Sequence, residues 1–135
     1  MQRGASFGGY PRVNQRVVRL RDRDAELPAL DGPLLAYGNG RSYGDVGLND
    51  GGILLDARGL DRFIAFDAAN GVLRCEAGVL LGEILDLVVP RGWFLPVSPG
   101  TQYVTVGGAI ANDVHGKNHH RAGSFGDHEI GRAHV

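Results

Sequence analysis

One lysine and three histidines lie within a single six-residue run, His115-Gly-Lys-Asn-His-His120. A lysine next to a histidine can bind substrate oxygens or help to move a proton, because imidazole titrates near neutral pH. Histidines in such a run could also bind a metal ion. No cysteine pair and no acidic residue stands at ligand spacing, so we expect no metal. An exposed polar loop without a ligand is the third interpretation.

Two glycine-rich segments could bind an anion. The first is Gly38-Asn-Gly-Arg-Ser-Tyr-Gly-Asp45, in which successive backbone N–H groups can form a concave anion site. Ser42 could add a hydroxyl donor and Arg41 a positive charge. The second is Pro99–Gly108, where Gly107 and Gly108 could open a helix and present N–H groups to a diphosphate. The alternative for the first segment is a hairpin loop without a ligand, and for the second a close approach of two backbones.

Composition limits the class of protein. The chain has 135 residues, 22 of them glycine, with ordinary hydrophobic and charged fractions, which fits one domain with one core. The net charge of −1 gives no reason to expect nucleic acid or an anionic membrane as partner. The single cysteine, Cys75, excludes an internal disulfide and fits a reducing compartment. We expect a cytoplasmic location for the chain, or a membrane-associated or periplasmic one for a longer protein.

The pattern of apolar residues predicts an α+β fold. The expected strands cover residues 16–20, 33–37, 53–56, 63–66 and 72–76, and the expected helices 23–30, 79–89 and 106–112. Asn70-Gly71 indicates a hairpin turn. The first glycine loop leads into a strand and not a helix, which argues against a dinucleotide fingerprint of the Rossmann kind. Cys75, Trp93 and Phe94 are expected in the core.

At these motifs the chain resembles flavoenzymes of the vanillyl-alcohol oxidase family, and within that family the decaprenylphosphoryl-ribose oxidase branch. The resemblance runs from about Tyr10 to His128. It is most specific in the long run from Thr105 to His120, whereas the first loop alone indicates only the superfamily. The fold it implies is the N-terminal part of a PCMH-type FAD-binding domain, a small mixed sheet with flanking helices and glycine-rich cofactor loops.

The resemblance also implies where the cofactor and substrate bind. Lys117 would face the substrate, with His115 as a second catalytic candidate. Arg41 occupies the position where relatives with covalent flavin often carry a histidine, so the resemblance implies non-covalent FAD. The implied cofactor-binding residues are Ala36, Tyr37, Gly38, Asn39, Gly40, Arg41, Ser42, Tyr43, Gly44, Asp45, Val46, Gly100, Thr101, Thr105, Val106, Gly107, Gly108, His115, Gly116, Lys117 and Asn118.

The chemistry implied by the resemblance is oxidation of a secondary hydroxyl on a sugar or a prenyl-phosphate sugar. A short-chain reductase would then be a partner in an epimerisation. An alditol or aldonolactone as substrate, and a fragment that binds FAD without catalysis, are the alternatives that stay open.

The chain departs from the family at its end. The family pattern ends at His128, and Glu129-Ile-Gly-Arg-Ala-His-Val135 does not fit it, so the expected FAD-binding domain covers residues 1–128. These seven residues are what GAG-ATC-GGA-AGA-GCA-CAC-GTC, a sequencing adapter, would encode. We therefore expect a non-native tail on a truncated FAD-binding domain, and little or no turnover by these 135 residues alone.

Overall fold

The computed structural model describes residues 1–132, and the chain divides into two compact units. The first unit covers residues 1–60, and the second begins at Asp61. Each unit has its own buried apolar residues, Ile53 and Leu54 in the first and a cluster that includes Val79 in the second. The expectation of a single domain over residues 1–128 stays a prediction.

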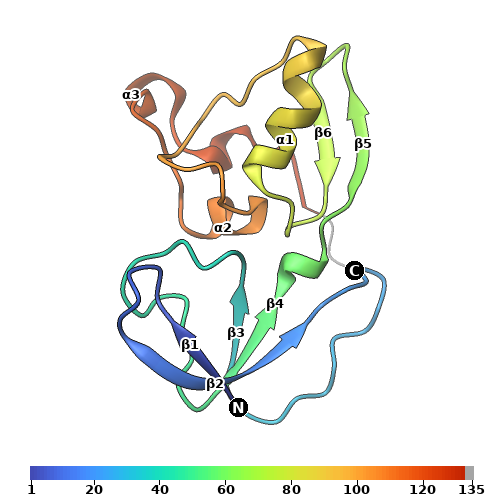
Figure 1. Cartoon of the computed structure of the whole chain (residues 1–135). Coiled ribbons are helices and arrows are strands. Elements are labelled where there is room, and N and C mark those ends of the chain that lie inside the picture. Colours follow the sequence, from blue (N-terminus) through green and yellow to red (C-terminus); the bar gives the residue numbers. More distant parts are fainter. Residues whose placement is uncertain (133–135) are drawn as a thin grey trace. The chain divides into compact units, whose positions relative to one another are not determined.

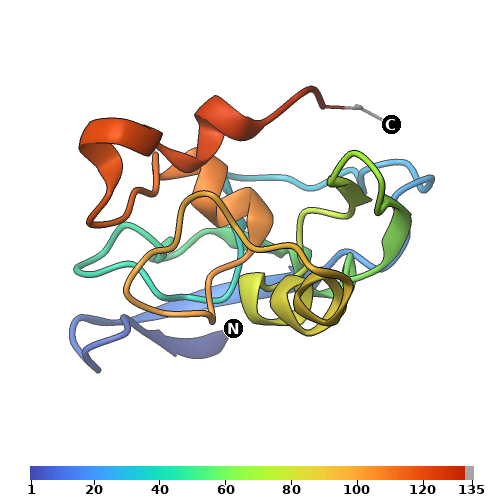
Figure 2. The same cartoon turned by 90° about the horizontal axis from the view of Figure 1, so that it is seen from above.

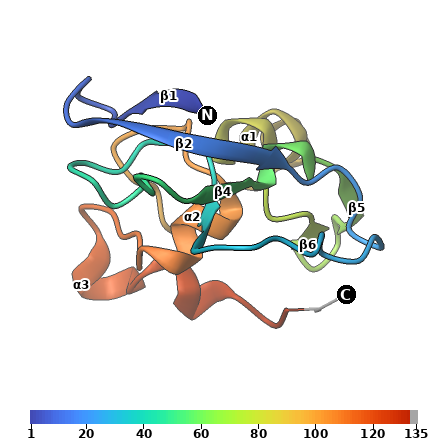
Figure 3. The same cartoon turned by 90° about the horizontal axis from the view of Figure 1, so that it is seen from below.

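The first unit is a four-stranded mixed sheet (Figure 1). Its strands are β1 (Gln2–Ala5), β2 (Arg12–Arg19), β3 (Leu34–Tyr37) and β4 (Ile53–Asp56), in the order β1-β2-β4-β3. β1 and β2 form an antiparallel hairpin and lie side by side in Figure 3, whereas β2, β4 and β3 run parallel. The strands at 33–37 and 53–56 are confirmed, the strand at 16–20 is part of a longer one, and β1 was not predicted.

β4 is an interior strand of this sheet because its apolar run can be buried. Ile53 is 6% exposed and Leu54 1%. The strand ends at Asp56, whose buried carboxylate lies 2.7 Å from the Arg19 guanidinium and also accepts the N–H of Arg58 at 2.9 Å. Pairing and a second hydrogen bond allow a carboxylate to be buried at the strand end.

Asn49 fixes the C-terminal end of the long glycine-rich connection between β3 and β4. Its side-chain amide donates to the carbonyls of Pro33 (2.9 Å) and Ile53 (3.0 Å), at the starts of two neighbouring parallel strands. Its backbone N–H donates to the buried side chain of Gln15 at 3.1 Å. The connection contains no helix, as expected for a fold that is not doubly wound.

The helix predicted over residues 23–30 is wrong, because the segment forms turns and irregular chain. Asp22 does accept a hydrogen bond from the N–H of Asp24 at 2.9 Å, as a capping residue would. Only five residues separate Asp22 from Pro28, and so short a segment without an apolar stripe cannot offset the cost of helix nucleation.

The second unit begins with the predicted hairpin, β5 (Phe63–Asp67) and β6 (Val72–Cys75). Gly71 takes the left-handed conformation that the turn requires, with φ of 67°. Asp67 accepts hydrogen bonds from Asn70 and Ala69, and those from Asn70 lower the pKa of its carboxyl. Burial, with a smaller effect of Glu76, raises the pKa of Cys75 to about 11, which fits its expected place against the core.

Trp93 and Phe94 are not core residues, contrary to expectation. Phe94 is 67% exposed and Trp93 38%. The Trp93 ring lies against Gly71, where an added Cβ would stand 2.6 Å from ring atoms. Its indole N–H donates to the Ala68 carbonyl at 2.7 Å. Trp93 therefore covers the hairpin turn, because a ring with a polar edge is satisfied at a half-exposed site.

Helix α1 (Leu81–Val88) packs beside the β5–β6 hairpin, as Figure 2 also shows. Its Leu81, Ile84 and Val88 recur at helical spacing and form one buried cluster with Val79. The chain continues to α2 (Val106–Ala111) and α3 (His119–Ala122), with short 3-10 turns at Ala57–Gly59, Val89–Arg91 and Phe125–His128. The helices predicted at 79–89 and 106–112 are confirmed. No helix within residues 1–132 is long and apolar enough to cross a membrane.

Candidate functional site

The first glycine loop, residues 38–46, follows β3 directly and presents unused backbone donors. Gly40 and Gly44 have φ of 63° and 65°, so two residues of the loop take the left-handed conformation. Within the described chain, the N–H groups of Gly40, Ser42 and Gly44 donate to no protein acceptor. Successive N–H groups around left-handed residues form a concave anion site. The loop therefore fits the diphosphate of a nucleotide cofactor.

The Tyr37 side chain packs against the backbone of this loop. A Cβ built on Gly40 would collide with the Tyr37 hydroxyl and stand 3.0 Å from its Cζ, and one on Gly47 would stand 3.7 Å from the same ring. Only glycine fits such a close approach at a positive φ. Tyr37, which the resemblance places among the cofactor residues, therefore lies against the loop backbone, and its ring shapes the loop.

The second glycine segment differs from the expectation. The N–H of Gly107 donates to the Ala77 carbonyl at 2.9 Å, and that of Gly108 to the Thr105 hydroxyl at 3.0 Å. The N–H of Val106 donates to Val79 at 2.9 Å. The first turn of α2 has therefore no donor left for a diphosphate, and the predicted anion-binding role of these N–H groups is wrong. The glycines serve close packing, since a Cβ on Gly107 would stand 3.2 Å from that of Ala77.

Thr105 and its neighbours have structural roles as well. Thr105 is 2% exposed and caps α2 through its hydroxyl, so its side chain is not available to a ligand. Thr101 accepts the N–H of Tyr103 at 3.2 Å. Gly100 has open space where a Cβ would stand. Contacts of Gly100, Thr101 and Val106 with a cofactor stay a prediction.

The loop that carries Lys117 is fixed by its two neighbours. Asn118 donates its amide to the Pro96 carbonyl at 3.1 Å, and a Cβ on Gly116 would stand 2.5 Å from the carbonyl oxygen of Ser98. Lys117 itself is exposed and bonds to nothing within residues 1–132. The loop thus holds a lysine at a defined position with its ammonium group unpaired.

His115 lies near a backbone carbonyl that can accept a hydrogen bond from its ring. Its Nδ1 stands 3.3 Å from the backbone carbonyl of Asp113, and a carbonyl can only accept. In a neutral ring this contact favours the tautomer with the proton on Nδ1, in which Nε2 is the acceptor. The ring lies edge-on to that of His119, with centroids 5.5 Å apart.

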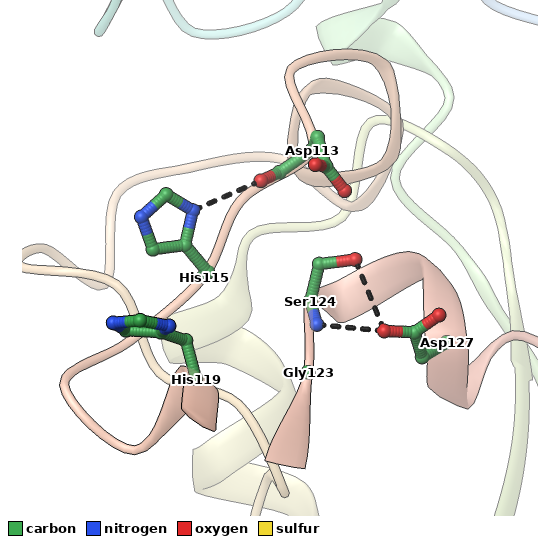
Figure 4. A pocket seen from close by; sticks show the side chains of 6 residues that line it. All are labelled: Asp113, His115, His119, Gly123, Ser124 and Asp127. Atoms are coloured by element: carbon green, nitrogen blue, oxygen red, sulfur yellow. Dashed lines mark hydrogen bonds between the residues drawn. The ribbon is translucent and has the colours of Figure 1, made fainter. Parts of the chain in front are cut away.

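An open hollow of about 320 Å³ lies beside these two histidines (Figure 4). Asp113, which follows the C-terminal cap of α2, has a φ of 49°, which is unusual for a residue other than glycine. Across from the histidines, the Asp127 carboxylate accepts the N–H of Ser124 at 2.8 Å. The hollow is lined by Asp113, His115, His119, Gly123, Ser124 and Asp127. Within the described chain, no group of three histidines, cysteines or acidic residues could hold a metal ion.

Sequence reasoning missed most of this hollow. His115 was a candidate, whereas Asp113, Ser124 and Asp127 were not. An antiparallel bridge between His115 and Ser124 brings these residues together, and spacing in the sequence could not show it. Lys117 is not among the residues that line the hollow. The first loop belongs to the other unit and forms its own candidate site.

The family described as FAD binding domain matches residues 25–131. Decaprenylphosphoryl-beta-D-ribose oxidase of Mycolicibacterium smegmatis is 48% identical over 112 residues, which are 83% of this chain and 24% of that protein. D-lactate dehydrogenase of Archaeoglobus fulgidus is 32% identical over 118 residues, which are 78% of this chain and 26% of that protein. The chain thus spans about a quarter of the length of these relatives.

Among solved structures, alkyldihydroxyacetonephosphate synthase has a similar fold, with a TM-score of 0.60 and 18% identity. The likeness covers 72% of this chain and 19% of that one. The family match, together with the 48% identity, confirms the resemblance found in the motifs, the partial PCMH-type domain and FAD as cofactor. The chain belongs to the FAD-binding domain family of FAD-dependent oxidoreductases.

Proposed function

We propose that this chain is the cofactor-binding portion of an enzyme that oxidises a secondary hydroxyl of a sugar or prenyl-phosphate sugar. The 48% identity to decaprenylphosphoryl-beta-D-ribose oxidase is the observation that carries the proposal. The relatives that act on D-lactate and D-2-hydroxyglutarate are close to 30% identical. The substrates in the names of these three relatives all carry a secondary alcohol, which supports this class of reaction.

The first loop would bind the FAD diphosphate through the N–H groups of Gly40, Ser42 and Gly44. When bound, FAD supplies the acceptor for the hydride. The substrate hydroxyl must lose a proton at the same time. A neutral His115 can accept a proton at Nε2, because its contact with the Asp113 carbonyl favours the tautomer with the proton on Nδ1. The unpaired ammonium of Lys117 can donate hydrogen bonds to substrate oxygens. That His115 and Lys117 lie beside the substrate in the Michaelis complex is part of the proposal.

A chimaera tests this proposal, since the chain spans only a quarter of its relatives. The matching segment of the Mycolicibacterium smegmatis oxidase would be replaced by residues of this chain. We expect the chimaera to bind FAD without a covalent bond and to lose flavin absorbance anaerobically with decaprenylphosphoryl-ribose. A chimaera that folds but holds no flavin, or whose flavin the ribose lipid does not bleach, would reject the proposal.

Variants of the chimaera test the two catalytic candidates. Lys117→Met and His115→Gln should retain the visible flavin spectrum and slow bleaching by about 10²-fold or more, as for loss of a group that moves or holds a proton. His120→Gln is the matched control, because His120 is exposed and does not line the hollow. Equal rates for all three variants would exclude His115 and Lys117 from the reaction.

A further inference from the structure

The β1–β2 hairpin gathers three arginines on one face. Arg3 pairs with Asn14 across the hairpin, so its side chain shares a face with those of Arg12 and Arg16, two residues to either side. Diagonal neighbours of this kind lie roughly 7–8 Å apart. All three arginines are exposed. The face thus combines three like charges within a short length of hairpin.

Protein carboxylates do not neutralise this face. Arg12 donates to the Gly9 carbonyl at 3.2 Å, and within residues 1–132 none of the three arginines forms an ion pair. Asp50 lies nearby and accepts the N–H of Asn14 at 3.2 Å, which leaves a surplus of positive charge. An open hollow of about 350 Å³ is lined by Arg3, Arg12, Val13 and Asn14. The face therefore offers space and charge for phosphate groups.

Exposed aromatic rings stand at the turn of the same hairpin. Tyr10 is 83% exposed and Phe7 53%, and Phe7 contacts Tyr43, which is 79% exposed, with centroids 5.9 Å apart. Arg41 lies over the Phe7 ring, 5.5 Å from its centroid, so this ring face is not open to a stacking base. Tyrosine rings beside basic residues are typical of segments that sit at a lipid headgroup layer.

From these observations we propose that the β1–β2 hairpin is a docking surface for a bilayer that contains anionic phospholipids. The phosphates of the lipid pair with Arg3, Arg12 and Arg16, and Tyr10 with Phe7 enters the headgroup layer. A free phosphate would use the arginines and leave the rings in water, so the two together favour a bilayer. The net charge of the chain, −1, does not reveal this surface, because it sums the charges of all residues.

Vesicle sedimentation tests the proposal with the 135-residue chain. We expect binding to vesicles of 70% phosphatidylcholine and 30% phosphatidylglycerol, and little binding to phosphatidylcholine alone. The triple variant R3Q/R12Q/R16Q should bind on the order of 100-fold more weakly, because each basic residue at an anionic surface contributes a factor of about five. The variant R3K/R12K/R16K should retain binding, and Tyr10→Ser should weaken it several-fold.

The matched control is R21Q/R62Q/R74Q, which removes the same charge from exposed arginines elsewhere and should bind as the unchanged chain does. Equal losses in the two triple variants, or equal binding to neutral vesicles, would overturn the proposal. Full displacement by 20 mM inorganic phosphate would indicate a phosphate site instead, and displacement only by a DNA 20-mer a nucleic-acid surface. Circular dichroism of every variant establishes that it is folded.

Discussion

Replacing Gly40 by alanine perturbs the first loop in two ways. Its φ of 63° costs an L-residue about 1–2 kcal/mol. A Cβ would also collide with the Tyr37 hydroxyl, and overpacking of this kind costs about 1–3 kcal/mol. Gly44 is the matched control, because its φ of 65° is nearly the same and nothing lies within 4 Å of its Cβ position. Gly44→Ala should therefore show the backbone cost alone.

Urea unfolding followed by circular dichroism measures this difference. We expect Gly40→Ala to lower the free energy of unfolding by about 1–3 kcal/mol more than Gly44→Ala does. Tyr37→Phe in the Gly40→Ala background should recover part of that difference, since it removes the colliding oxygen. FAD titration, followed by flavin fluorescence, should show weaker binding for Gly40→Ala, because the displaced loop no longer directs its N–H groups at the FAD diphosphate.

Two results would refute this reasoning. Equal free energies of unfolding for the two alanine variants would mean that Tyr37 does not lie against Gly40. Unchanged FAD affinity in Gly40→Ala, with the loss of stability as expected, would mean that the loop shape is right but that the loop does not bind the cofactor.

Three further predictions concern the second unit. Thr105→Ala should lower the free energy of unfolding by about 1 kcal/mol through loss of the α2 cap, whereas Thr101→Ala should change it by a few tenths, as urea unfolding will show. Trp93→Ala should cost about 2 kcal/mol, because it removes the hydrogen bond to Ala68 and the cover of the hairpin turn, and Phe94→Ala should cost under about 0.5 kcal/mol. Cys75 should resist alkylation by iodoacetamide at pH 8 until urea unfolds the chain. Because folding raises its pKa from 9.0 to about 11, the native state binds more protons between these values, so stability should fall as pH rises from 9 to 11, and Cys75→Ala should remove that part of the pH dependence.

Local sequence was sufficient to predict those elements whose structure depends on interactions between neighbouring residues. Asn70-Gly71 set the hairpin turn, the apolar spacing from Leu81 to Val88 set α1, and the apolar runs set β3 and β4. The motifs also identified the family, since runs such as Thr105 to His120 are specific as strings of letters. The helix predicted after Asp22 was wrong, because a single capping residue cannot stabilise a helix that lacks an apolar stripe.

Only the tertiary structure decided how the two glycine segments differ. Both are rich in glycine, but the donors of Gly40 and Gly44 stay unused, whereas those of Gly107 and Gly108 are taken by Ala77 and Thr105. The hydrogen bond from Gly107 to Ala77 joins residues 30 positions apart, so the residues around either one could not predict it. The same holds for the bridge that joins His115 to Ser124, and for the hairpin register that aligns Arg3 with Arg12 and Arg16. Sequence thus identifies the groups able to bind an anion, and non-local pairing decides which of them remain free to do so.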